Sequence, residues 1–92
     1  MIRTKIPLIL IVDDSDLTRT SLTRLFEEYN CRTESCEDGI YGIQKAISHK
    51  PDVIILDILM PNLDGIKTLQ IKKVIDEVKN IPVIILSGNV NK

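Results

Sequence analysis

Three short apolar runs constrain the fold of this chain more strongly than any other feature. They are residues 6–12 (IPLILIV), 52–56 (DVIIL) and 81–86 (IPVIIL), and each is rich in β-branched side chains. Continuous runs of this length are typical of strands that are covered on both faces, as in a parallel sheet. Parallel strands need long connections, which are usually helices. The chain is therefore expected to alternate strands with helices.

The connection after the first run has the spacing of a helix. Within residues 15–30, four apolar side chains recur at positions i, i+3, i+4 and i+7, which places them on one helical face. They are Leu22, Leu25, Phe26 and Tyr29. Asp14, Ser15 and Asp16 stand just before this segment and are candidates for its N-cap.

Two further helices are expected. The second covers residues 38–48, and its inward-facing side chains are predicted to be Ile40, Ile43 and Ile47. The third covers residues 65–78, but its apolar residues fall into two stripes on different faces of the helix. Lys72 and Lys73 lie between these stripes and are expected on a solvated face.

The order of these elements predicts one α/β domain over residues 1–92. Strand and helix alternate as β-α-β-α-β-α-β, which gives a doubly wound, three-layer α/β/α sandwich of the flavodoxin-like type. Residues 31–35 (CRTES) are mostly polar, so the second strand is expected at an edge of the parallel sheet. The predicted strand order is then 2-1-3-4.

Composition narrows the functional classes. Twelve basic and thirteen acidic residues give a net charge of −1, so neither a nucleic acid nor an anionic membrane is an expected partner. No apolar run approaches the roughly 18 residues of a membrane span. The first apolar run ends in two aspartates rather than small residues, which argues against a secretory signal. We expect a cytoplasmic protein in which Cys31 and Cys36 are free thiols.

Acidic side chains follow two of the expected strands directly. Asp13 and Asp14 come after the first strand, Asp57 ends the third, and Ser87 follows the fourth. Carboxyl ends of parallel strands meet at one edge of the sheet, where ligands bind. Three carboxylates at one edge repel each other, and Mg²⁺ with its oxygen ligands would relieve this. Each aspartate alone could instead cap a helix or form a turn.

Taken together, these motifs resemble those of a known family. The Asp13-Asp14 pair, residues 57–65 (DILMPNLDG) and Ser87-Gly88 resemble the receiver, or phosphoacceptor, domains of two-component response regulators, which are CheY-like. The resemblance implies that Asp57 accepts a phosphoryl group from a sensor histidine kinase or a phosphotransfer protein. It also implies that Ser87 contacts the phosphoryl group and couples phosphorylation to a change of shape.

The resemblance further implies a magnesium site and a signalling role. Mg²⁺ would be held by Asp13, Asp14, Asp57 and the backbone carbonyl of Leu59. Such a domain is not an enzyme in the usual sense, because at most it catalyses its own phosphorylation and dephosphorylation.

The sequence departs from the family pattern after the fourth strand. Receivers continue through a fourth helix, a fifth strand that ends in a functional lysine, and a fifth helix, whereas this sequence stops at Lys92, which is not placed to be that lysine. We therefore expect a truncated receiver with impaired phosphorylation. The strand at residues 81–86 would be left as an uncovered apolar edge, so a homodimer or higher oligomer through that strand is expected.

Two alternatives stay open from the sequence. The chain could be a receiver-derived fragment that self-associates and has no working phosphorylation. It could also be a haloacid-dehalogenase-like phosphatase, because residues 14–18 (DSDLT) fit that family's motif, with Asp14 as nucleophile and Asp16 as general acid. The phosphatase alternative leaves Asp13 and residues 57–65 without a role.

Overall fold

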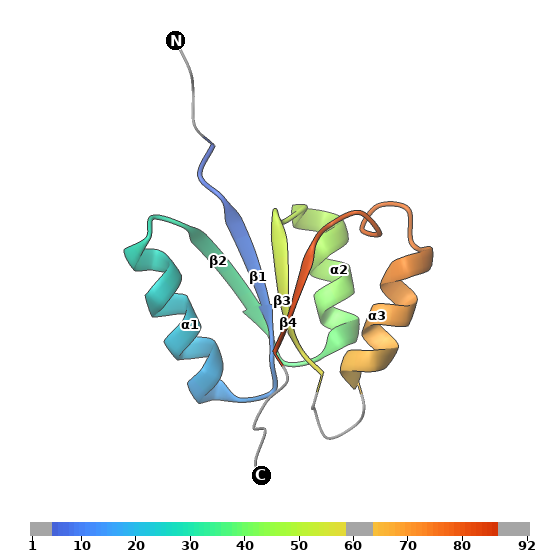
Figure 1. The fold of residues 1–92 in the computed structure, drawn as a ribbon, viewed down its shortest axis with the longest axis horizontal. Helices are drawn as coiled ribbons and strands as arrows, with labels where there is room; N and C mark the ends of the chain where they lie inside the picture. The colour runs from blue at the N-terminus through green and yellow to red at the C-terminus, as the bar shows by residue number, and fades with distance from the viewer. Residues whose placement is uncertain (1–4, 59–63, 87–92) are drawn as a thin grey trace.

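Four parallel strands form one sheet in the order β2-β1-β3-β4, with helices in the connections (Figure 1). The computed structural model describes residues 5–58 and 64–86. The elements are β1 (Leu8–Val12), α1 (Asp16–Glu28), β2 (Arg32–Cys36), α2 (Gly39–His49), β3 (Val53–Asp57), α3 (Asp64–Val74) and β4 (Val83–Leu86). The predicted fold class and strand order are therefore confirmed.

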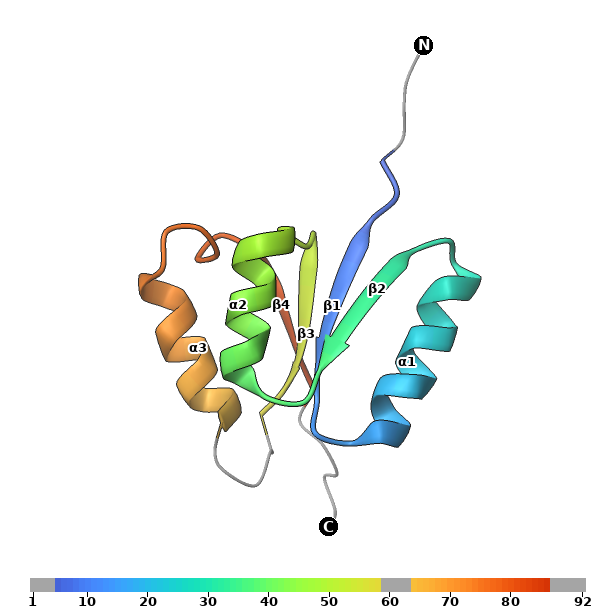
Figure 2. The same cartoon turned by 180° about the vertical axis from the view of Figure 1, so that it is seen from behind.

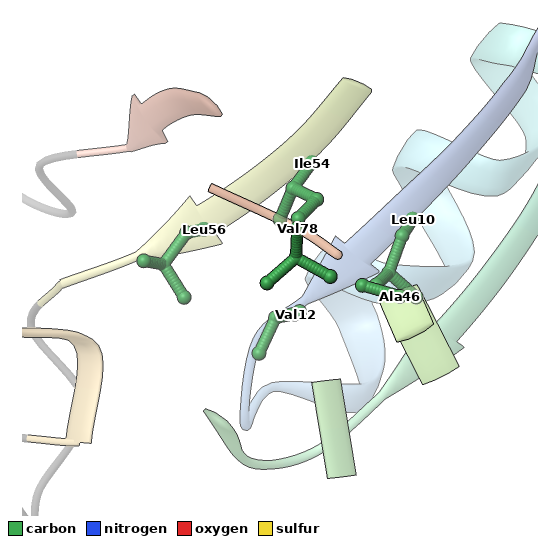
Figure 3. Packing of buried hydrophobic residues seen from close by; sticks show 6 residues of the cluster. All are labelled: Leu10, Val12, Ala46, Ile54, Leu56 and Val78. Carbon is green, nitrogen blue, oxygen red and sulfur yellow. The ribbon is translucent and has the colours of Figure 1, made fainter. Parts of the chain in front are cut away.

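The helices lie on both faces of the sheet and make the three expected layers. α1 covers one face, and α2 and α3 cover the other (Figures 1 and 2). Strand residues alternate between two cores. On the α2 side the buried residues are Leu10, Val12, Ala46, Ile54, Leu56 and Val78 (Figure 3). The smaller core on the α1 side consists of Ile9, Ile11 and Ile55.

Proline shortens two of the predicted strands at their starts. β1 begins at Leu8 rather than at residue 6, and β4 begins at Val83 rather than at residue 81. Pro7 and Pro82 accept hydrogen bonds through their carbonyl groups, from the backbone N–H of Arg32 (2.8 Å) and of Ile54 (2.9 Å) respectively. Because proline has no N–H to donate, it marks the start of each ladder instead of extending it.

α1 begins as the sequence predicts but contacts the sheet through fewer residues. The Ser15 side chain caps the helix and accepts a hydrogen bond from the Thr18 backbone N–H at 3.2 Å. Leu22 and Phe26 pack against the small core, whereas Leu25 and Tyr29 are exposed. Only two of the four apolar residues on the predicted helical face therefore pack against the core. None of the residues of α1 is fully buried.

α2 approaches the sheet through small residues rather than through the predicted isoleucine stripe. Its buried residues are Gly39, Gly42, Ile43 and Ala46, which share one helical face. A Cβ at Gly42 would lie only 2.9 Å from Cγ2 of Val12. This close approach turns Ile40 toward solvent, where it is 51% exposed, so the prediction that Ile40 faces inward was wrong. Ile43 and Ile47 do pack in the core.

The most deeply buried residues of α3 are not large apolar side chains, although Leu69 on the same face packs against the core. Gly65, Thr68 and Lys72 are buried at positions i, i+3 and i+7. The Lys72 Nζ donates a hydrogen bond to the carbonyl of Lys79 at 3.1 Å, so the prediction of a solvated Lys72 was wrong. The helix ends at Val74 rather than at residue 78, and the turn that follows brings Val78 into the core.

Candidate metal and phosphoacceptor site

Two strand ends bring three aspartates together, as the sequence predicts. Val12 of β1 pairs with Leu56 of β3. Asp13 follows Val12 and Asp57 follows Leu56, so the two aspartates lie next to each other at the carboxyl edge of the sheet. One carboxylate oxygen from each of Asp13, Asp14 and Asp57 lies within 4.8 Å of the others. Asp13 is 3% exposed and Asp57 is 9% exposed, whereas Asp14 is open to solvent.

Backbone contacts fix the position of Asp13. Its Oδ1 accepts a hydrogen bond from the Ser15 backbone N–H at 2.8 Å, and its own N–H donates to the Cys36 carbonyl at 3.1 Å. The guanidinium of Arg19 donates to the Asp13 carbonyl at 2.5 Å and pairs with Asp16. Sequence reasoning missed Arg19, although its spacing of three residues from Asp16 on a helix is a signal for such a pair.

The aspartates of the site affect one another's ionisation. Burial raises the pKa of Asp13, and the neighbouring Asp57 and Asp14 raise it further, although the hydrogen bond from Ser15 acts in the opposite direction. A divalent cation among these oxygens would reverse the effect of the neighbouring charges, because it favours the ionised form. Among the described residues, the clustered donors are carboxylate oxygens, which fit Mg²⁺ and do not favour Zn²⁺ or copper.

A cleft of about 500 Å³ gives access to these carboxylates. It is lined by Asp13, Asp14, Ser15, Thr18, Asp57, Ile85 and Leu86. The lining combines polar residues from the ends of β1 and β3 and the start of α1 with two apolar residues at the end of β4. Asp57 is therefore reached through this cleft, although little of its surface is exposed.

The start of α3 packs directly against the backbone of the site. A Cβ at Gly65 would lie 2.6 Å from the carbonyl oxygen of Asp57 and 3.2 Å from the carbonyl carbon of Ile58. Ordinary non-bonded contacts are longer than this, so only glycine fits here. The sequence places Gly65 at the end of the 57–65 motif, but its contact with Asp57 depends on the fold and cannot be read from the motif.

Not every predicted site residue falls within the described part of the chain. Leu59 and Ser87 lie outside the described residues. Asp16, the general acid of the phosphatase alternative, is exposed, pairs with Arg19 and is not part of the aspartate cluster. The arrangement around Asp57 therefore gives that alternative no support.

Comparison with known families decides the assignment. The model of the response regulator receiver domain matches residues 9–92. The chain belongs to the response regulator receiver domain family. It is thus a receiver domain of two-component signalling, and the resemblance inferred from its motifs is confirmed. No helix in the described part of this receiver is long and apolar enough to cross a membrane.

Several curated proteins are similar to this receiver in sequence. Sporulation initiation phosphotransferase F of Bacillus subtilis is 38% identical over 80 residues, which cover 87% of this chain and 63% of that protein. A protein-glutamate methylesterase/protein-glutamine glutaminase of Lawsonia intracellularis is 42% identical over 83 residues, which cover 87% of this chain. The receiver spans only 22% of that methylesterase and 15% of the transcription factor prr1 of Schizosaccharomyces pombe.

Solved structures share the fold. The N-terminal domain of a response regulator receiver protein from Methanoculleus marisnigri superposes with a TM-score of 0.87 at 27% identity, covering 96% of this chain and 72% of that one. The receiver domain of a sensor histidine kinase from Pseudomonas aeruginosa superposes with a TM-score of 0.84 at 25% identity, covering 92% and 70%. That structure has a magnesium ion coordinated in its active site cleft.

Proposed function

We propose that this receiver accepts a phosphoryl group on Asp57 from a sensor histidine kinase or a phosphotransfer protein, with Mg²⁺ bound beside it. The observation that carries the proposal is the convergence of three carboxylates, from Asp13, Asp14 and Asp57, within 4.8 Å at one open cleft. The family supplies the reaction type, and the geometry supports these residues as its participants.

The proposed reaction is a displacement at phosphorus. A carboxylate oxygen of Asp57 forms a P–O bond while the P–N bond to the donor imidazole breaks, and the imidazole leaves with the electron pair. When bound, Mg²⁺ neutralises charge on the carboxylates and on the transferred group. Asp13 and Asp14 would hold the cation together with Asp57, and the Ser15 N–H keeps the Asp13 carboxylate oriented. We extend the proposal to the Leu59 carbonyl as a further ligand and to Ser87 as a phosphoryl contact.

A small-molecule phosphodonor tests this proposal. The protein is incubated with acetyl phosphate and saturating Mg²⁺, and its intact mass is measured. We expect a gain of one phosphoryl group in the native protein and in Asp76→Asn, an exposed aspartate outside the cluster. Asp57→Asn should gain none. A folded native protein that binds Mg²⁺ but gains no mass would instead favour the receiver-derived fragment that has no working phosphorylation.

We also propose that β4 pairs with β4 of a second copy. β4 is an edge of the described sheet, and it exposes Ile84 by 52% and Ile85 by 40% on opposite faces. β2, the other edge, carries the charged side chains of Arg32 and Glu34, which disfavour strand pairing. The apolar edge is thus the one suited to an isologous contact.

Sedimentation velocity at micromolar concentration tests the pairing of β4. We expect a dimer or a larger species for the native protein and a monomer for Ile84→Lys. Thr33→Lys on β2 is the matched control and should associate like the native protein. A well-folded native monomer at these concentrations would rule the proposal out.

A further inference from the structure

Among the helices and strands of the described residues, α3 packs most extensively against α2. The two helices lie side by side on the same face of the sheet (Figure 2). The buried face of α3 begins with Gly65 and Thr68, and both residues are almost inaccessible to solvent. The position of α3 therefore depends on how closely α2 allows Thr68 to approach.

The first residue of α2 sets that approach. A Cβ at Gly39 would lie 2.8 Å from the Thr68 Cβ and 3.1 Å from its Cγ2, and it would overlap the Thr68 Oγ1. Carbon atoms in favourable contact are about 3.5–4.0 Å apart, so no side chain fits at Gly39 while Thr68 stays in place. Gly39 does not have a positive φ, so space rather than backbone conformation requires glycine here.

One turn before Thr68, α3 also contacts the end of β3, which carries Asp57. Gly65 lies so close to the carbonyl of Asp57 and to Ile58 that an added Cβ would collide with both. A sideways shift of α3 is thus expected to push on, or to release, the backbone that carries the Asp57 carboxylate. Thr68 and Gly65 are three residues apart on a helix, which transmits such a shift because it is stiff.

We propose that the contact between Gly39 and Thr68 positions Asp57 for the cation and the phosphoryl group. Gly39 and Thr68 are then positioning residues, since neither is among the residues that line the cleft. The predicted effect of this contact on phosphorylation rests on the proposed function. The predicted effect on structure does not, because Gly39→Ala should displace the Asp57–Ile58 backbone whether or not phosphorylation occurs.

A double-mutant cycle tests the proposal. Gly39→Ala introduces the collision, Thr68→Gly removes the colliding side chain, and the double variant combines the two. Ala46→Gly, a fully buried position of α2 in the hydrophobic core, serves as a control for lost stability. Three quantities are measured per folded molecule: the Mg²⁺ affinity by calorimetry, the phosphorylation rate with acetyl phosphate at saturating Mg²⁺, and the amide chemical shifts of Asp57 and Ile58.

The expected results separate positioning from stability. Gly39→Ala should slow phosphorylation at least about tenfold, because small misplacements of a reacting group are costly. It should also weaken Mg²⁺ binding and move the two amide signals. The double variant should recover to within about threefold of Thr68→Gly alone. Ala46→Gly should unfold more easily but keep the native rate and affinity. A Gly39→Ala protein with native rate and amide shifts, or a double variant without recovery, overturns the proposal.

A second variant keeps the test decisive if Gly39→Ala does not fold. Thr68→Ala loosens the contact without a collision and should slow phosphorylation several-fold, whereas Thr68→Ser, which keeps the hydroxyl, should restore most of the rate. Equal rates for native protein and Thr68→Ala would overturn the proposal. If the native protein is not phosphorylated at all, the proposed function fails, and the amide shifts and Mg²⁺ affinities still decide the positioning role.

Discussion

The substitution Asp13→Asn tests whether repulsion between the site's carboxylates lowers the free energy of unfolding, and whether a bound cation removes this effect. The carboxylates of Asp13 and Asp57 approach within 4.8 Å and are both buried. Two unit charges at this distance repel by about 0.9 kcal/mol at the dielectric constant of water and by about 3.5 kcal/mol at an effective value of 20. Asparagine removes this repulsion and keeps an Oδ1 that can accept the hydrogen bond from Ser15.

We expect opposite effects of Asp13→Asn without and with Mg²⁺. Without divalent cations at neutral pH, the free energy of unfolding should rise by about 1–3 kcal/mol, within the Coulomb range above. With Mg²⁺ at ten times its dissociation constant, the native protein should gain about 1.4 kcal/mol, and the variant should gain much less because a ligand is lost.

The raised pKa of Asp13 gives the stability of the native protein a pH dependence of defined sign, which Asp13→Asn should remove. The pKa of Asp13 is raised in the folded protein, so the unfolded chain releases this proton at lower pH than the folded one. Without metal, native stability should therefore fall as the pH rises from the ordinary aspartate range through the raised pKa. The variant should lack this decrease.

Urea unfolding followed by far-ultraviolet circular dichroism measures these quantities, with ionic strength held constant by NaCl. Asp76→Asn is the control, since Asp76 is exposed and pairs only with Lys79 among the described residues. It should respond to Mg²⁺ like the native protein. An Asp13→Asn protein that is no more stable than native without metal, or that gains as much from Mg²⁺, would refute the reasoning.

Three further predictions concern two buried side chains, Lys72 and Ile11, and the half-buried Cys36. Burial lowers the pKa of Lys72, so stability should rise with pH toward the ordinary lysine value of about 10.4, and Lys72→Met should abolish this rise in urea unfolding between pH 8 and pH 10. Burial raises the pKa of Cys36 to about 11, so in Cys31→Ser the alkylation rate should increase about tenfold per pH unit until that range. Ile11→Ala should lower the free energy of unfolding by about 2–5 kcal/mol in the same urea assay, because Ile11 is fully buried.

The sheet and the aspartate cluster could be predicted because both follow from the order of strands. Once the strands are parallel, the residues after β1 and β3 must meet at one edge, and Asp13, Asp14 and Asp57 do so. Membership of the receiver family followed from the same motifs. The roles of Leu59 and Ser87 remain predictions, since both lie outside the described residues.

The buried faces of α2 and α3 could be predicted less well, because close contacts between the elements bury small and polar residues there in place of some of the apolar ones. α2 buries Gly39 and Gly42 in place of Ile40, and α3 buries Thr68 and Lys72. Hydropathy places such residues in solvent, so the two stripes of α3 could not be resolved from sequence. Only the distance between the helices shows why glycine and threonine belong inside.

Because α1 packs against the sheet through few residues, cation binding at the acidic site is expected to be coupled to local unfolding of α1. α1 has no fully buried residue, yet its N-cap residue Ser15 and its residue Arg19 donate hydrogen bonds to Asp13. Amide protons of α1 should therefore exchange with solvent before those of the central strands. When this helix detaches, Asp13 loses its hydrogen bonds from Ser15 and Arg19 and keeps the one to Cys36. A cation bound at Asp13 would therefore favour the state in which α1 is packed on the sheet.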